Sequence, residues 1–174
     1  MIVVGLGNPG KKYEQTRHNV GFMIVDRLVD QLNGTKWKKE RGVRWSKVDE
    51  HWVIKPQEYM NMSGASLKSF LDYKHLNLTD VTQLLVVHDD LDFPLGEMHE
   101  QVNRSAGGHN GVQSIIDALG TQNFGRLRIG IGNNHSANVP AEDYVLQIFT
   151  PIESQTIKQA VDQAGATLRQ RLGA

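Results

Sequence analysis

The sequence predicts an α/β fold: a single-domain, three-layer α/β/α sandwich around a mixed, largely parallel central sheet. Its 174 residues suit one domain, and its 39% hydrophobic and 22% charged residues are ordinary for a globular protein. Short β-branched runs alternate along the chain with apolar stripes of helical spacing. Such alternation is typical of sheets that helices cover on both faces. We therefore expect one domain over residues 1–174.

The first strand and the first helix have the clearest patterns. Ile2-Val3-Val4 is a β-branched run that stops at a glycine loop, which indicates a short buried strand. A helical stripe follows, and we expect a helix from about Asn19 to Asn33, closed by Gly34. The apolar residues of this stripe are Val20, Ile24, Leu28 and Leu32, widened by Met23 and Val25.

The remaining elements continue the alternation. The segment from Trp37 to Val53 has no helical period and predicts two strands around a turn near Asp49-Glu50. Asn61-Met62-Ser63 is expected to cap a helix that contains Leu67, Phe70 and Leu71. The later elements predicted are a strand over Leu84–Val87 that stops at His88-Asp89-Asp90, a helix with Val112, Ile115, Ile116 and Leu119, a strand over Arg126–Ile131, and a helix over Ile152–Leu172.

The composition leaves the partner open and excludes several classes of protein. Because 19 basic and 19 acidic residues balance, any contact with nucleic acid needs a local basic patch. The absence of cysteine excludes disulfides, zinc–thiolate sites and thiol catalysis. No basic region precedes the apolar Met1–Leu6, and no apolar stretch approaches the roughly 20 residues that span a bilayer. We expect a cytoplasmic protein that is neither exported nor membrane-embedded.

Unusual polar residues fall at the predicted junctions between strands and helices. In α/β sheets of this kind, the carboxyl ends of the strands form the crevice that binds ligands. Residues far apart in the chain are therefore expected to meet in one crevice. These residues are Asn8, His18, Asn61, Asp89 and Asn110.

The loop Gly5-Leu6-Gly7-Asn8-Pro9-Gly10 matches the G-x-G-x-x-G pattern of dinucleotide-binding proteins. That use requires a helix that begins within the motif and an acidic residue about 20 positions later, at the end of the next strand. The segment Lys11–Gln15 has no apolar stripe, and Asp26 and Asp30 lie inside the predicted first helix. The sequence favours an active-site loop, with a purely structural turn as the remaining alternative.

His18 and Asp89 have the residue types and positions of a general base and its partner. A helix amino terminus disfavours the imidazolium ion, which predicts that His18 is neutral at pH 7. Asp89 follows a buried strand, where a carboxylate needs a partner for its charge. If it accepts the Nδ1 proton of His18, Nε2 is left free to take a proton from water. With no cysteine and no serine in a G-x-S-x-G context, activated water is the nucleophile that remains.

Each of these residues also has a simpler interpretation. Considered alone, His18 is more often a structural residue at this kind of position, and Asp89 a helix or turn cap. A second alternative is a magnesium site formed by Asp89, Asp90 and Asp92. The amides of Asn8, Asn61 and Asn110 suit an amide backbone or an oxyanion, although asparagine is commonly a cap or turn residue.

Basic residues near the expected crevice are candidates for contact with a nucleic-acid backbone. Lys11, Lys12 and Arg17 adjoin the glycine loop, and Arg104, Arg126 and Arg128 join them if they reach the surface there. A second basic run, with Trp37 and Trp45 interleaved, suits phosphates and stacked bases, and a solvated strand face explains it equally well. That run consists of Lys36, Lys38, Lys39, Arg41, Arg44 and Lys47.

Four blocks of the sequence resemble the bacterial-type peptidyl-tRNA hydrolase family. The first block is Gly5–Gly10 with Tyr13 and Thr16–Gly21, and the second is Lys55-Pro56 with Tyr59–Gly64. His88–Asp92 forms the third, and Gly107–Gly111 with Arg126–Gly132 forms the last. The blocks occur in the family's order and cover nearly the whole chain.

The resemblance implies a monomeric enzyme, free of metal and cofactor, that cleaves the ester of peptidyl-tRNA released from stalled ribosomes. By this match His18 is the catalytic base and Asp89 its partner. The match makes Asn8, Asn61 and Asn110 the substrate-positioning amides. Tyr13 and Met60 are expected to line the crevice, and His109 to support the loop that carries Asn110. The peptidyl-tRNA partner is expected to bind through its acceptor end and attached peptide.

The sequence departs from the family after Gly96. Where relatives often carry basic residues, this chain has Glu97, His99, Glu100 and Gln101. Two rival functions also stay open at this point. One is a non-catalytic RNA-binding protein of the same fold, and the other is an aminopeptidase or other metal hydrolase of similar architecture.

Overall fold

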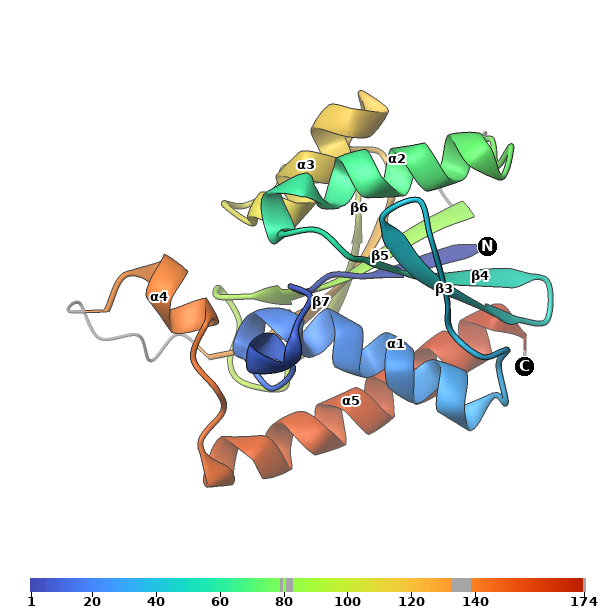
Figure 1. The fold of residues 1–174 in the computed structure, drawn as a ribbon. Helices are drawn as coiled ribbons and strands as arrows, with labels where there is room; N and C mark the ends of the chain where they lie inside the picture. Colours follow the sequence, from blue (N-terminus) through green and yellow to red (C-terminus); the bar gives the residue numbers. More distant parts are fainter. Residues whose placement is uncertain (79, 81–82, 133–138, 174) are drawn as a thin grey trace.

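The protein is a seven-stranded mixed sheet between two layers of helices (Figure 1). The structure, a computed structural model, describes residues 1–78, 80, 83–132 and 139–173. The sheet order is β2-β3-β4-β1-β5-β7-β6. The strands are β1 (Ile2–Gly5), β2 (Lys38–Glu40), β3 (Val43–Val48), β4 (His51–Pro56), β5 (Leu84–Asp90), β6 (Met98–Val102) and β7 (Gly125–Gly130).

The four central strands are parallel, and antiparallel pairs close both edges of the sheet. β4, β1, β5 and β7 run in one direction, while β3 and β6 run against their neighbours. Residues of β1 and β5 are buried on both faces of the sheet, as expected for central parallel strands. The predicted three layers and mixed sheet are confirmed.

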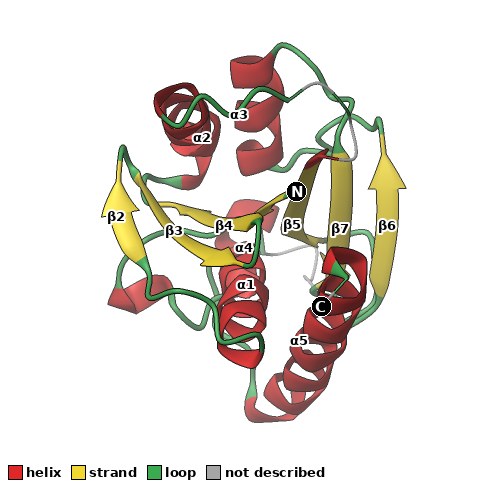
Figure 2. Cartoon of the chain, turned by 90° about the vertical axis from the view of Figure 1, so that its right-hand side faces the viewer, coloured by secondary structure: helices red, strands yellow, loops and turns green. Residues whose placement is uncertain are grey.

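Each face of the sheet has its own hydrophobic core. The helices are α1 (Val20–Gln31), α2 (Ser63–Tyr73), α3 (Asn110–Leu119), α4 (Ala141–Val145) and α5 (Pro151–Leu172). Val3 packs with α1 and α5 on one face, whereas Ile2 and Val4 pack with α2 and α3 on the other. Figure 2 shows these two helix pairs on opposite sides of the strands.

The register of the parallel strands brings the predicted site residues to one edge. Gly5, the last residue of β1, pairs with Val87 of β5. The loop after Gly5 and the carboxyl end of β5 therefore leave the sheet at the same level. Leu6 continues this contact by donating its amide hydrogen to the Val87 carbonyl, at 2.9 Å.

Several elements differ from the sequence prediction. His88, Asp89 and Asp90 do not stop the strand, because they continue the pairing of β5 with β7. Asn61 does not cap α2, since it lies in the 3-10 turn η3 (Met60–Met62) and the helix begins without a side-chain cap. The edge strands β2 and β6 and the helix α4 were not predicted. They are short or polar, so they carry little periodic signal.

The helices α2 and α3 meet at Gly64, where a side chain has no room. A Cβ atom built on Gly64 would lie 1.9 Å from the backbone oxygen of Ser114. The Gly64 amide also donates a hydrogen bond to the Ser114 hydroxyl at 2.9 Å. Glycine at this position therefore sets how closely the two helices pack.

Gly64→Ala is expected to lower the free energy of unfolding by about 1–3 kcal/mol, because the methyl group must push the helix backbones apart. Urea denaturation measures this change. Ser69→Ala, on the exposed side of the same helix, serves as the control and should stay within about 0.5 kcal/mol of the parent. Equal midpoints for the two variants would contradict the close-packing argument.

Candidate active site

A crevice lies at the carboxyl edge of the parallel strands, between β5, the start of α3 and the helix α4. Its cavity measures about 460 Å³. It is lined by His18, Asp89, Asp90, Leu91, Asp92, Gly107, Gly108, His109, Asn110, Pro140, Ala141, Glu142 and Val145. Three predicted site residues, His18, Asp89 and Asn110, and the predicted supporting residue His109 thus share one cavity.

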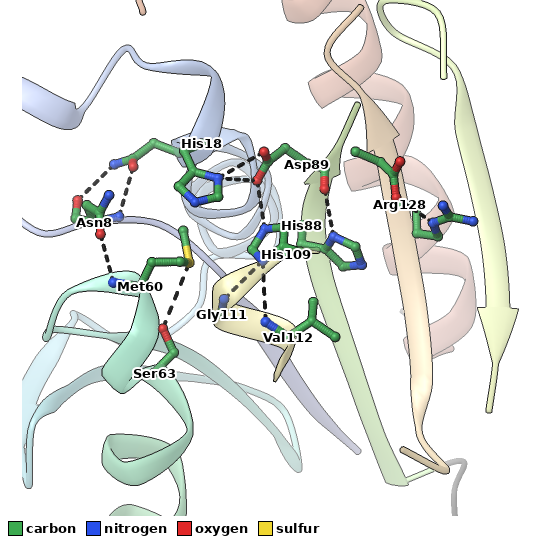
Figure 3. A network of polar contacts seen from close by, with 12 residues as sticks. Asn8, His18, Met60, Ser63, His88, Asp89, His109, Gly111, Val112 and Arg128 are labelled. Atoms are coloured by element: carbon green, nitrogen blue, oxygen red, sulfur yellow. Dashed lines mark hydrogen bonds and ion pairs between the residues drawn. The ribbon is translucent and has the colours of Figure 1, made fainter. Parts of the chain in front are cut away.

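His18 and Asp89 form a buried hydrogen-bonded pair in this crevice (Figure 3). His18 lies in the 3-10 turn η2 (Arg17–Asn19) before α1, and Asp89 lies near the end of β5. Nδ1 of His18 is 2.9 Å from each carboxylate oxygen of Asp89. The two residues are 8% and 2% exposed. No described residue forms a hydrogen bond with Nε2 of His18, so this nitrogen is available to a water molecule.

His109 is a second imidazole on the same carboxylate. Its Nδ1 accepts the amide hydrogens of Gly111 and Val112 at 3.1 and 3.3 Å, which caps the amino terminus of α3. The ring proton must therefore reside on Nε2, which donates to Oδ1 of Asp89 at 2.9 Å. The helix amides thus fix His109 as a neutral donor to Asp89.

A third histidine, His88, contacts both Asp89 and His109. Its Nδ1 donates to the backbone oxygen of Asp89 at 2.7 Å, and its ring meets the ring of His109 edge-on. Burial, with the charges of neighbouring groups, holds the pKa of His88 well below the usual range. The ring is therefore neutral, and the negative charge of the cluster resides on Asp89.

The pKa of His18 is shifted in the opposite direction to the one that the helix terminus predicts. Burial lowers the pKa of His18, but the charge and hydrogen bond of Asp89 outweigh it and raise the pKa above its ordinary value. For the Asp89 carboxyl, burial acts in the opposite direction and raises the pKa, but His18 and His109 hold this pKa far below its usual range. The predicted helix-terminus effect does not dominate, because the carboxylate is in direct contact with the imidazole.

Asn8 does not line the cavity that contains His18 and Asp89 but a separate one, which Asn19 also lines, and its orientation is fixed. Asn19 accepts the Asn8 amide hydrogen through Oδ1 and donates through Nδ2 to the Asn8 carbonyl, both at 2.9 Å. Oδ1 of Asn8 accepts from the Met60 amide at 2.9 Å, which leaves Nδ2 as its free donor end. Asn19 was not predicted as a site residue, although it is a polar residue next to His18 and lies in the block Thr16–Gly21.

Met60 contacts both Asn8 and the start of α3. Its side chain is buried, and its sulfur lies where a side chain of Gly111 would begin, 2.4 Å from an ideal Cβ atom. Asn61 and Asn110 are exposed, and Asn110 reaches the cavity from the first turn of α3. Asn61 and Tyr13 lie on 3-10 turns outside the lining of this cavity, and the Tyr13 ring meets that of Tyr59.

The glycine loop has no helix to bind a pyrophosphate. It is followed by the three-residue 3-10 turn η1 (Lys11–Tyr13), and α1 begins only at Val20. The loop instead presents Asn8, which supports the active-site interpretation of the motif.

His18, Asp89 and His109 also offer three potential metal-ligand atoms within 4.8 Å of one another. Two imidazoles and a carboxylate suit several transition metals. However, the amides of Gly111 and Val112 keep the proton of His109 on the nitrogen that a metal would need. The donor set therefore fits a hydrogen-bonded cluster better than a metal. The magnesium alternative is not supported either, since Asp90 accepts a hydrogen bond from Arg128 at 2.7 Å.

Three arginines that were candidates for tRNA contact are buried: Arg126 and Arg128 do not reach the surface, which was the condition for their contact, and Arg17 is buried as well. Arg126 is 1% exposed and donates to the carbonyls of Arg104 and Ser105, and burial lowers its pKa to about 10. Arg128, 3% exposed, pairs with Asp90. Arg17 is also 3% exposed and pairs with Glu153.

Three other candidates for tRNA contact reach the surface. Lys11 and Lys12 are exposed beside the glycine loop. Arg104 is partly exposed, and its guanidinium lies 3.9 Å from Asp92.

Four residues of the crevice wall were missed by the sequence analysis. Pro140, Ala141, Glu142 and Val145 belong to α4 and the residue before it, and they face the cavity opposite Asp90 and Asp92. This short segment carries no motif, so only its position in the structure identifies it.

An α/β sandwich with a paired histidine and carboxylate in its crevice is the framework of a hydrolase that activates water by a general base. The family model described as Peptidyl-tRNA hydrolase matches residues 2–173. A peptidyl-tRNA hydrolase of Bacillus subtilis is 43% identical over 94% of this chain and 87% of its own length. One from Aquifex aeolicus is 47% identical, over 94% and 85%.

A solved structure agrees with these relatives. The crystal structure of peptidyl-tRNA hydrolase from Acinetobacter baumannii matches with a TM-score of 0.85 and 33% identity, over 97% of this chain and 86% of that one. The chain belongs to the peptidyl-tRNA hydrolase family, and the resemblance inferred from the sequence blocks is confirmed.

Asp89→Asn tests the electrostatic coupling of the pair. In the parent, kcat/KM should rise with pH through the raised pKa of His18, because only the neutral imidazole accepts a proton. Without the carboxylate charge, burial dominates and the pKa of His18 falls. The pH at which kcat/KM begins to fall on the acid side should therefore be lower in the variant. The plateau value of kcat/KM should drop by about 10²-fold or more. pH–rate profiles measure both, and an unmoved acid limb would contradict the assignment.

Proposed function

We propose that this protein hydrolyses the ester bond between the peptide and the tRNA of peptidyl-tRNA, and so recycles tRNA released from stalled ribosomes. The observation that carries the proposal is the His18–Asp89 pair, held in the crevice of a chain that belongs to this family. None of the relatives described above is named as a non-catalytic RNA-binding protein, so the comparisons give that alternative no support.

The proposed reaction begins with a water molecule bound at Nε2 of His18. The water oxygen attacks the ester carbonyl carbon, and Nε2 takes the proton that the water loses. Asp89 stabilises the imidazolium through its contacts with Nδ1. The tetrahedral intermediate then breaks its bond to the ribose oxygen, which receives the proton from Nε2. The products are a peptide with a free carboxylate and a tRNA with a free hydroxyl group.

Side-chain amides supply the uncharged hydrogen bonds of the proposed site. The Nδ2 group of Asn8 is free to donate because its Oδ1 accepts from Met60. Asn110 lines the cavity beside His109. We assign the oxyanion to Asn110 and the peptide backbone to Asn8 and Asn61. Tyr13 and Met60 are proposed to contact the substrate next to Asn8, outside the cavity that contains His18.

The tRNA contacts assigned here are few and are limited to exposed cations. Lys11 and Lys12 lie beside the glycine loop and are the primary candidates for a phosphate contact. Arg104 is a further candidate, although its guanidinium also lies near the Asp92 carboxylate.

The setting of the enzyme is also part of the proposal. We infer a single domain over residues 1–174 that acts as a monomer in the cytoplasm, without a metal or cofactor. Among the described residues, no helix is both long enough and apolar enough to cross a membrane.

His18→Ala should reduce turnover of N-acetyl-aminoacyl-tRNA more than Asn110→Ala. A positioned base contributes about 10² to 10⁴ in rate, and one oxyanion donor about 10² to 10³. Single-turnover hydrolysis measures both losses. His75→Asn, an exposed change beyond the end of α2, is the control and should retain the parent rate. Near-parent turnover by folded His18→Ala would remove the basis of the mechanism.

The enzyme should prefer an acylated amino group on its substrate. An amide next to the ester can bond to Asn8 or Asn61, whereas a free ammonium group would lose solvation without gaining an acceptor. Comparing kcat/KM for acetylated and free aminoacyl-tRNA of the same amino acid measures this preference. Equal values would show that the side-chain amides do not read the peptide.

A further inference from the structure

Arg17, the residue before His18, is a buried cation at the junction of four segments. Its Nη2 contacts both carboxylate oxygens of Glu153, in the first turn of α5, at 3.0 and 2.8 Å. Its guanidinium also lies against two aromatic rings, with centroid distances of 4.4 Å to Tyr144 of α4 and 4.9 Å to Phe149. The guanidinium therefore contacts a carboxylate and two aromatic rings.

The same guanidinium reaches the strand ends that carry the catalytic carboxylate. Nη1 of Arg17 donates to the Ile131 carbonyl at 3.4 Å, and the Tyr144 hydroxyl donates to that oxygen at 3.1 Å. The Ile131 amide in turn donates to the Asp90 carbonyl at 3.0 Å. One residue, Ile131, thus links the residue before His18 to the residue after Asp89.

Arg17 also joins this turn to the wall of the crevice. Its amide donates to the Gln147 carbonyl at 3.0 Å, and Thr16 forms a β-bridge with Ile148. The helix α4, whose Ala141, Glu142 and Val145 line the cavity, is packed against the Arg17 side chain through Tyr144.

We propose that Arg17 is a positioning residue of the hydrolase: with Glu153 as its anion, it holds the His18 imidazole against Asp89 and fixes the α4 wall of the crevice. This role rests on the proposed function only in that it serves the same His18–Asp89 pair. It replaces the expected contact with tRNA, which the burial of Arg17 excludes.

The pair is charged throughout the neutral pH range. Burial raises the pKa of Glu153, but hydrogen bonds from Arg17 and Thr150 outweigh it and lower the pKa below its ordinary value. Removing Glu153 leaves the buried charge of Arg17 without its anion, whereas removing both partners does not. Lysine keeps the charge but loses the flat, forked group that fits between the two rings.

The experiment compares Arg17→Gln, Glu153→Gln, the double variant and Arg17→Lys. A small displacement of a base can cost about 10²-fold, so we expect kcat to fall roughly 10- to 100-fold in each Gln single variant. The double variant should lose no more than the poorer single variant, and Arg17→Lys should recover part of the rate.

The titration of His18 separates positioning from mere stability. Among the described residues, Asp89 and His109 contact His18, and Asp90, Asp92 and Glu142 line the same cavity; none of these is changed in the variants. If the contact with Asp89 loosens, the pKa of His18 should fall toward its ordinary value, and the acid limb of kcat/KM should follow. NMR titration of the imidazole reports this pKa without any turnover. An inactive parent would therefore refute the proposed function while leaving the role of Arg17 measurable.

Arg27→Gln is the matched control. Arg27 forms an exposed ion pair with Asp162 at 2.7 Å that also ties the first part of the chain to α5, away from the crevice. It should keep kcat and the His18 titration of the parent within about twofold. If Arg17→Gln does not fold, Glu153→Gln tests the same contact and keeps the shape of the side chain. A folded Glu153→Gln variant with parent kcat and parent His18 pKa would overturn the proposal.

Discussion

The structure depends most on one buried carboxylate, that of Asp89, placed between two imidazoles. A carboxylate removed from water is costly unless charge and hydrogen bonds compensate it. Here His18 contacts both oxygens, and His109 donates to one of them. The pKa of Asp89 therefore lies far below its usual range in spite of burial. The rest of the site serves to bring these two rings to this one anion.

The two rings differ in role because different helix termini hold them. The amides at the start of α3 bond to Nδ1 of His109 and keep it neutral, so it serves only as a donor. His18 precedes α1 in a 3-10 turn, and its Nε2 has no hydrogen-bond partner among the described residues. The same carboxylate thus holds one fixed donor and one imidazole that is free to exchange a proton.

Close backbone approach makes this convergence sterically feasible. Gly21 of α1 sits where a Cβ atom would lie 2.4 Å from the Val87 carbonyl of β5, which draws the His18 turn toward the strand of Asp89. Gly111 makes the same room for Met60 at the start of α3. These glycines occur in the sequence blocks that resemble the family, and the structure gives the physical reason for them.

The sequence by itself determined the order of most strands and helices, because apolar periodicity and glycine loops are local signals. Because polar residues at strand ends gather along one edge of a parallel sheet, the sequence also singled out His18, Asp89 and Asn110, which share one cavity. The resemblance to the family added His109, whereas Asn8 lies outside that cavity. Tertiary structure decided what each group contacts. Arg17 reaches Glu153 across 136 positions of the chain, and the tautomer of His109 follows from the amides of a helix end. Such pairings depend on the sheet order and on strand register, which no local pattern records, so a buried cation and an exposed one look alike until the chain has folded.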